Sequence, residues 1–400
     1  MLAVSYAASG EEVIAIAAKD AVLAHGKLSV RRLRQYLAER HFQELYTRFQ
    51  LKILSHAGQL DNDLIITPPA ELQLMILNYP EANSNEELET SLFRACQSGA
   101  LQEVEDCLEA LTDPNTDKMT DPLHQAAGAG YPEIVKILQE ARADIDSQSI
   151  HGETPLHSAA RGWRDAEGVY SEIAKILLEA RAHVDAQDMH GETALHYAAK
   201  GGRADVVAVL LEGGCYKSPV SLHRAVSWGR LNVVQLLIAA GVPYVVDETG
   251  ETPLFQAASY GYEGIVRALL QSGASIDAPT HTGWTPLHGA CHAGHFQVVQ
   301  ALLEAGAHKE LADDHGRRPL HLAAEHDQVK ILRLLLEAGS DAAAVDHAGK
   351  TSLHIAGQHG HMRIARVLLA AGGNKEARDS DGRTPWQLAR ENGRIMELLL

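Results

Sequence analysis

The stretch GWTPLHGACHAGHFQVVQALLEAGA, residues 283–307, contains one complete structural unit. A Thr-Pro turn signal precedes a Leu-His pair and a short helix of small residues, which a glycine ends. A second predicted helix carries Val298, Val299, Leu302 and Leu303 at the spacing of one apolar helix side. Neither helix is long enough to bury that side alone, so the unit needs a copy of itself on each side.

Copies of this unit recur through most of the chain. Each copy has one leucine, here called the anchor, followed in most copies by histidine. The anchors are Leu92, Leu123, Leu156, Leu195, Leu222, Leu254, Leu287, Leu320 and Leu353, with Trp386 in the tenth place. The last five are 33 residues apart, and this period with T-P-L-H-x-A is the ankyrin signature.

The chain therefore resembles ankyrin-repeat proteins over residues 88–400. The resemblance implies a mainly α solenoid of about ten repeats, each with two helices and a β-finger. It also implies that the anchor histidine hydrogen-bonds a neighbouring loop and so links successive repeats. From the residues themselves we expect the Thr before each anchor to cap the first helix, and a Gly seven residues past the anchor to end it.

Two steps between anchors differ from the period by six residues. The step from Leu156 to Leu195 is long, and its extra residues fall around Trp163–Gly168, between the two helices of repeat 3. The step from Leu195 to Leu222 is short, and Gly213–Pro219 replaces the usual finger. These departures are either partner-specific shape or neutral drift in loops.

Residues 1–80 have a different character from the repeats. Their Lys+Arg and Asp+Glu counts are both 8, so the net charge of −17 belongs to residues 81–400. Two apolar runs around Gly10 predict a hairpin, and Ser29–Arg40 predicts an amphipathic helix. Further strands are predicted at Phe49–Leu54 and Ala70–Leu77. Two strands, a helix and then further strands is the element order of a β-grasp fold.

With Leu51–Leu54, Ala57–Asp61 and Leu72–Leu74, this order resembles a ubiquitin-like domain, a small α+β fold. The resemblance implies an exposed apolar patch for docking to ubiquitin or proteasome machinery, with Ala8, Leu54 and Met75 at the corresponding positions. The alternative is that Leu54 and Met75 are half-buried sheet residues. The last strand continues into Asn78-Tyr79-Pro80 rather than a Gly-Gly tail, so we expect a fixed docking module. A polar linker is predicted at 81–87.

Composition excludes several partners and compartments. The acidic surface repels phosphate backbones, which argues against nucleic acid and anionic lipid. No apolar run is long enough to span a membrane, and the N-terminus does not resemble a signal peptide. The four cysteines lack CxxC spacing and are expected to be reduced, in the cytoplasm or the nucleus.

The 22 histidines invite a metal or catalytic interpretation. His288 and His354 already occupy the structural position after the anchor, and no cysteine or acidic set completes a four-coordinate site. The motifs of phosphate-binding loops, metalloproteases and serine hydrolases are also missing. We therefore expect no enzyme activity and no cofactor.

The function that remains is recognition of other proteins. The resemblance implies that the finger tips and the concave face made by the first helices bind them. The candidate residues at the tips are Met189, His190, His281, His315 and His347. Six residues past the anchors, at the rim of that face, stand Trp228, Tyr260, His326 and His359, and Tyr197 is a weaker candidate. Exposed aromatics suit a binding hot spot, but Trp228 and Tyr260 could equally pack on neighbouring repeats.

The fingers also carry an acidic stripe, where many ankyrin repeats have asparagine. Its members are Asp146, Asp185, Asp277, Glu310 and Glu376. The stripe predicts a partner with basic segments. Two functions remain open: an adaptor that links a client to ubiquitin machinery, or a structural or inhibitory binding protein in which the β-grasp domain caps the array.

Overall fold

The structure, a computed structural model, describes most of the repeat region and separate strands before it. The described residues are 2–6, 12–16, 28–29, 49–55, 58–59, 65–66, 71–78, 83–109, 114–115, 121–164 and 168–391. They divide into two compact units, which are residues 1–122 with 140–143 and residues 123–139 with 144–400. None of the described helices is long and apolar enough to span a bilayer.

The first unit contains a mixed sheet of five strands in the order β2-β1-β7-β4-β5, and β3 pairs separately with β6. Strand β1 pairs antiparallel with β2 and parallel with β7, and β4 pairs antiparallel with both β7 and β5. The strands are β1 Leu2–Tyr6, β2 Glu12–Ile16, β3 Leu28–Ser29, β4 Phe49–Ser55, β5 Gly58–Gln59, β6 Ile65–Ile66 and β7 Glu71–Asn78. The helix predicted over 29–40 falls, beyond Ser29, outside the described residues.

Helices α3 (Asn83–Ser98) and α4 (Leu101–Glu109) complete the first unit. Residues 83–87 of the linker predicted at 81–87 are helical. Asn83 and Ser84 are residue types that begin helices, and the acidic Glu86 and Glu87 favour the positive end of the helix dipole.

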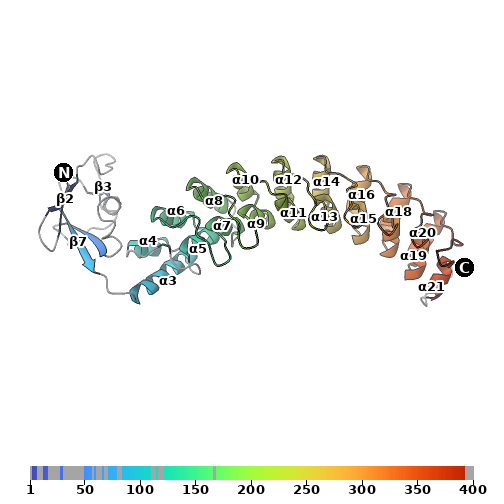
Figure 1. The fold of residues 1–400 in the computed structure, drawn as a ribbon, viewed down its shortest axis with the longest axis horizontal. Coiled ribbons are helices and arrows are strands. Elements are labelled where there is room, and N and C mark those ends of the chain that lie inside the picture. Colours follow the sequence, from blue (N-terminus) through green and yellow to red (C-terminus); the bar gives the residue numbers. More distant parts are fainter. Residues whose placement is uncertain are drawn as a thin grey trace. The chain divides into compact units, whose positions relative to one another are not determined.

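The second unit is a stack of helix pairs. In Figure 1 the second helices α10, α12 and α14 lie side by side in one row, and the first helices α9, α11 and α13 in another. The bounds are α5 Pro122–Ala129, α6 Pro132–Glu140, α7 Pro155–Arg161, α8 Val169–Glu179, α9 Ala194–Gly201, α10 Ala204–Glu212, α11 Pro219–Ser227, α12 Leu231–Ala239, α13 Pro253–Tyr260, α14 Glu263–Gln271, α15 Pro286–Ala293, α16 Phe296–Glu304, α17 Pro319–Glu325, α18 Val329–Glu337, α19 Ser352–His359, α20 Met362–Ala370 and α21 Pro385–Glu391. The spacing of the anchors thus predicts the pairs correctly.

Burial follows the repeat. Every anchor leucine is at most 1% exposed, and the paired alanines that follow it, such as Ala159–Ala160 and Ala323–Ala324, are fully buried. Small side chains allow first helices to approach closely, and the second helices fill the rest of the core with Val, Ile and Leu. Each pair therefore buries its apolar side only between two neighbours.

A histidine bridge joins one repeat to the next, as the family resemblance implied. In repeat 7 the His288 Nδ1 accepts the Thr285 N–H at 3.1 Å, and its Nε2 lies 3.1 Å from the Arg317 carbonyl of repeat 8. A peptide N–H only donates and a carbonyl only accepts, so the ring is neutral with its proton on Nε2. The same bridge, also at 3.1 Å, joins His157 to Glu192, His321 to Ala344 and His354 to Arg383.

A second inter-repeat contact lies at the other end of the first helices. The residue eight past the anchor donates to a carbonyl in the last turn of the preceding first helix: His295 Nε2 to Ser259 at 3.0 Å, and His361 Nε2 to Glu325 at 3.0 Å. Arg203 and Arg230 do the same. The Gly seven past the anchor makes room, because a Cβ on Gly261 would lie 2.5 Å from His295 Nδ1.

This close approach predicts unequal effects of two glycine substitutions. Gly261 and Gly273 both have positive φ, +80° and +89°, but nothing lies within 4 Å of a Cβ at Gly273. We expect Gly273→Ala to lower the free energy of unfolding by about 1 kcal/mol through backbone strain alone. Gly261→Ala should cost at least about 2 kcal/mol, because His295 must also move. Urea unfolding followed by circular dichroism measures both, and equal losses would contradict the contact.

The neutral bridges predict a loss of stability in mild acid. Burial holds the pKa of His157, His196, His288, His321 and His354 below the usual 6.5. The unfolded chain is therefore protonated first as the pH falls, so the stability is complete above about pH 6.5 and decreases below it, by up to about 1.4 kcal/mol per pH unit for each histidine. Despite burial, hydrogen bonds hold the pKa of Asp188, Asp247, Asp313 and Asp379 below the usual 3.8, so these carboxylates affect stability only in stronger acid.

A single substitution tests this assignment. In repeat 10, Gln387 takes the histidine position and its Oε1 accepts the Thr384 N–H at 2.8 Å. A glutamine at position 288 can therefore still accept the Thr285 N–H, but its side chain is too short to reach the Arg317 carbonyl as well. We expect His288→Gln to cost about 1 kcal/mol at pH 8 and to have a flatter dependence between pH 7 and 5.5. Parallel pH curves for wild type and variant would show that His288 is not the titrating group.

Candidate protein-binding surface

The rim consists of the residues six past the anchors. Trp228 follows α11 and Tyr260 ends α13 on the adjacent repeat, and they are 52% and 53% exposed. The Lys200 ammonium lies 5.2 Å from the Trp228 ring, and the Tyr260 ring lies 6.0 Å from that of Tyr262. Both side chains thus contact neighbours and still present about half of their surface to solvent, which is what a preorganised aromatic contact requires.

Imidazoles lie on and beside the rim of repeats 7 to 9: His326 and His359 are six past their anchors, and His292 is five past its own. His292 lies edge-on to His326 with 4.2 Å between ring centroids, and 5.1 Å from Trp284. Partial burial, and the nearby His326, hold the pKa of His292 below its usual value. His359 stacks on His361 at 5.6 Å. This part of the rim is polar and aromatic.

Two aromatic side chains of the stretch 283–307 serve the fold. Trp284 donates its indole N–H to Asp313 at 3.1 Å beneath the Arg317 guanidinium, and His295 makes the inter-repeat bond described above. Tyr197 is likewise occupied. Its hydroxyl lies 2.7 Å from Asp188 and 3.1 Å from Glu153, under the Arg161 guanidinium.

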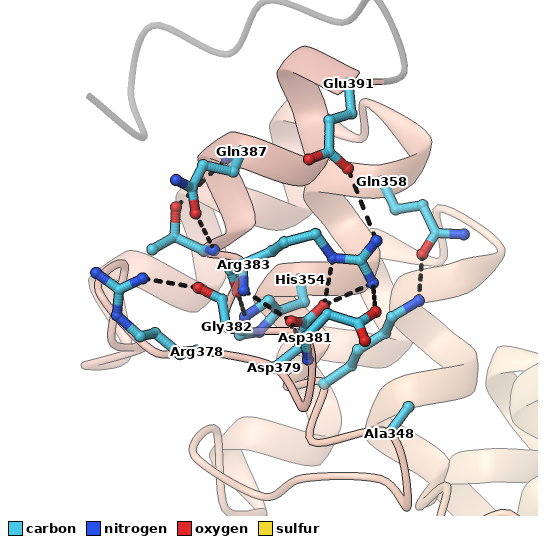
Figure 2. A network of polar contacts seen from close by, with 12 residues as sticks. Ala348, His354, Gln358, Arg378, Asp379, Asp381, Gly382, Arg383, Gln387 and Glu391 are labelled. Atoms are coloured by element: carbon cyan, nitrogen blue, oxygen red, sulfur yellow. Dashed lines mark hydrogen bonds and ion pairs between the residues drawn. The ribbon is translucent and has the colours of Figure 1, made fainter.

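Five of the described fingers are held by one buried or half-buried aspartate seven residues before the anchor, a position that Ser149 and Thr280 take in repeats 3 and 7. Figure 2 shows repeat 10, where Asp379 Oδ1 accepts the N–H groups of Asp381 and Arg383 at 3.0 and 2.8 Å, and Oδ2 pairs with the Arg383 guanidinium. Asp188, Asp247, Asp313 and Asp346 accept the equivalent pairs of N–H groups. The sequence interpretation missed these residues, although a recurring D-x-x-G marks them.

The predicted finger-tip residues are exposed. Met189 is 70% exposed, and His190, His281, His315 and His347 are exposed too. Two of the rings also pack on the preceding finger, His281 against Gly250 and His347 against Gly316. The tips are therefore accessible but partly positioned by their neighbours.

Most of the acidic stripe has a structural role that the sequence did not reveal. Asp146 accepts the His183 N–H at 2.9 Å, Asp185 accepts that of Tyr216 at 2.8 Å, and Asp277 accepts that of His308 at 3.0 Å. Glu310 accepts the Asp341 N–H and pairs with Arg318. Each carboxylate joins its finger to the base of the next one, so the stripe alone is poor evidence for a basic partner.

The insertion in repeat 3 lies between α7 and α8, where the spacing predicts it. Tyr170 is completely buried, and its hydroxyl accepts the Trp163 N–H at 3.0 Å and donates to the Gly128 carbonyl at 3.2 Å. Arg203 of the following repeat lies 4.4 Å from the Tyr170 ring. The described ends of the insertion are thus fixed to the repeats on both sides, while Trp163 remains 46% exposed.

Among the ubiquitin-like patch residues, Ala8 lies outside the described residues. Leu54 is in β4 and pairs with Gln73 of β7, and Met75 is in β7 and pairs with Lys52 of β4. The described residues include no group of three or more His, Cys, Asp or Glu that could hold a metal ion. Their four cysteines are buried free thiols, and burial raises the pKa of Cys215 to about 11.

Comparison with protein families agrees with this architecture. The family model described as ankyrin repeats (3 copies) matches residues 92–188, 123–221, 218–280 and 277–346, and the single ankyrin-repeat model matches 348–380. No curated protein matches the chain. Ankyrin repeats are protein–protein interaction modules. The matched segments cover well over half of the sequence, so the chain belongs to the ankyrin-repeat family.

Proposed function

We propose that this chain is a non-enzymatic adaptor whose repeats hold a client protein at the rim of repeats 5 and 6. The observation that carries the proposal is the pair Trp228 and Tyr260. Two large rings, each about half exposed, stand at the same position of adjacent repeats and are steadied by Lys200 and Tyr262. Such rings give contact area at low entropic cost, as binding hot spots require.

Arginines of repeats 5 and 6 are already paired within the array, which favours an aromatic contact with the client over a charged one. Arg224 of repeat 5 pairs with Glu192, and Arg267 of repeat 6 lies 2.9 Å from Glu263. Exposed ion pairs of this kind contribute little free energy. The client affinity should therefore depend more on Trp228 and Tyr260 than on these charges.

The second function of the adaptor is docking to ubiquitin or proteasome components. Residues 1–80 carry it out as a ubiquitin-like module. The strand order β2-β1-β7-β4-β5, with β1 parallel to β7, supports a β-grasp fold. The register adds support, because residues paired across strands share a face of the sheet. Leu54 opposite Gln73 and Met75 opposite Lys52 thus occupy diagonal positions on one face.

One differential experiment tests both functions. Full-length chains are crosslinked to partners in cell lysate and the partners are identified by mass spectrometry, for the wild type, Trp228→Ala/Tyr260→Ala and Leu54→Arg/Met75→Arg. We expect the recovery of clients to fall at least about tenfold in Trp228→Ala/Tyr260→Ala, while the recovery of ubiquitin-handling proteins is unchanged. In Leu54→Arg/Met75→Arg, the recovery of ubiquitin-handling proteins should fall and that of clients should be unchanged.

The matched control is Ile150→Ala, which truncates a finger-tip side chain that is 53% exposed, like the two rim aromatics. It should recover both groups of partners. If both double variants recover every partner that the wild type recovers, the adaptor function is wrong.

A further inference from the structure

One finger is missing from the row, and the resulting finger gap is a built feature of the surface. Residues 213–218 join α10 to α11 directly, between the fingers formed by residues 180–193 and 240–252. The short segment is tied to both sides. The Tyr216 N–H donates to Asp185 at 2.8 Å, and the Lys217 ammonium donates to the Ala240 carbonyl at 2.7 Å. The bases of the flanking fingers are therefore bridged, and only the outer part of the row is interrupted.

The interruption breaks a chain of backbone hydrogen bonds. Between four other pairs of neighbouring fingers a tip N–H donates to the carbonyl of the preceding tip: Met189 to His151 at 3.0 Å, Asp314 to Thr282 at 3.2 Å, His347 to His315 at 2.9 Å and Ser380 to Ala348 at 2.9 Å. The equivalent groups at the finger gap are the His190 carbonyl and the Glu248 N–H. Neither has a backbone partner among the described residues. They are a free acceptor and a free donor in the turns that flank the finger gap, and the backbone of an arriving extended chain can bond both.

Apolar side chains are concentrated around the same place. Met189 is 70% exposed, Tyr216 69%, Val220 46%, Val245 45% and Val246 48%. Val245 is held there because its carbonyl accepts the His223 Nε2–H at 2.8 Å. These five residues are nearly half of the large apolar side chains that the described part of the chain exposes. Such a concentration is typical of a binding surface.

The flanking fingers are acidic. Asp185, Asp188 and Glu192 lie on one side and Asp247, Glu248 and Glu251 on the other, against Arg181 and Lys217. Glu192 pairs with Arg224, whereas Glu251 has no cation partner among the described residues. Burial and the charge of Asp247 raise the pKa of Glu251. An arriving lysine or arginine would stabilise its charged form.

We propose that the finger gap binds an extended segment of a partner protein in which apolar side chains alternate with lysine or arginine. The segment takes the place of the missing finger, bonding the His190 carbonyl and the Glu248 N–H while its apolar side covers Tyr216 and the valines. A basic partner is favoured over a second copy of this chain, because the chain has a net charge of −17. This inference rests on the proposed function of the array as a protein-binding module. The finger gap is a surface separate from the rim, and its partner is an extended basic and apolar segment.

The probe is a disulfide-cyclised β-hairpin peptide with alternating valine and lysine, titrated against the full-length chain by fluorescence anisotropy. Two matched hairpins replace lysine by glutamate, or valine by serine. We expect the valine–lysine hairpin to bind at least about tenfold more tightly than either, with an affinity that decreases as salt increases. Equal binding of the three hairpins would overturn the proposal.

Variants locate the binding. Tyr216→Glu/Val220→Glu should weaken it by at least about tenfold, and Ile150→Glu, on another finger tip, should leave it unchanged. A third variant replaces residues 213–221 with a copy of residues 305–319, which restores a complete finger. Its helical circular dichroism should match the wild type, and its binding of the hairpin should be lost. Retained binding in this variant, or an equal loss in Ile150→Glu, contradicts the finger gap as the site.

These outcomes are independent of the adaptor experiment. Trp228→Ala/Tyr260→Ala leaves residues 213–221 intact, so it should bind the valine–lysine hairpin like the wild type. Loss of clients with retained hairpin binding separates the rim from the finger gap. If Trp228→Ala/Tyr260→Ala retains its clients and the restored-finger variant loses hairpin binding, the rim is overturned and the finger gap is supported.

Discussion

The buried imidazole that joins one repeat to the next is the interaction on which the array depends. One ring nitrogen accepts a peptide N–H within its own repeat, and the other donates to a carbonyl of the next repeat. A charged ring could not accept, and an apolar side chain would leave both peptide groups unpaired in the interior. The same side chain therefore caps a helix, positions a finger and connects neighbouring repeats.

This constraint explains why so few residues are left for recognition. The anchors and alanines are buried, the finger aspartates hold turns, and the stripe carboxylates bind the next finger. Polar residues that look like ligands in the sequence are mostly fixed by the backbone. What remains is the rim with Trp228 and Tyr260, the finger tips and the finger gap. Binding specificity is thus carried by side chains that the fold does not use.

Much of the architecture could be predicted from the sequence because the constraints repeat with the period. The helix pairs, the Thr caps, the site of the insertion and the short step after Leu195 all follow from the spacing of the anchors. Roles that join two repeats were harder to predict. The sequence shows that Asp277 is acidic and that Tyr197 is aromatic, but not that they bond His308 and Asp188. Only the packing of neighbouring repeats brings those partners together.

The most direct test of this account is to observe the imidazoles themselves. Two-bond ¹H–¹⁵N nuclear magnetic resonance spectra of the ¹⁵N-histidine-labelled chain report the tautomer and charge of each ring. The bridging histidines, His157, His288, His321 and His354, should be neutral at pH 7, with a slowly exchanging proton on Nε2. Rings that are charged at pH 7, or that carry the proton on Nδ1, would contradict the histidine bridge as the link between repeats.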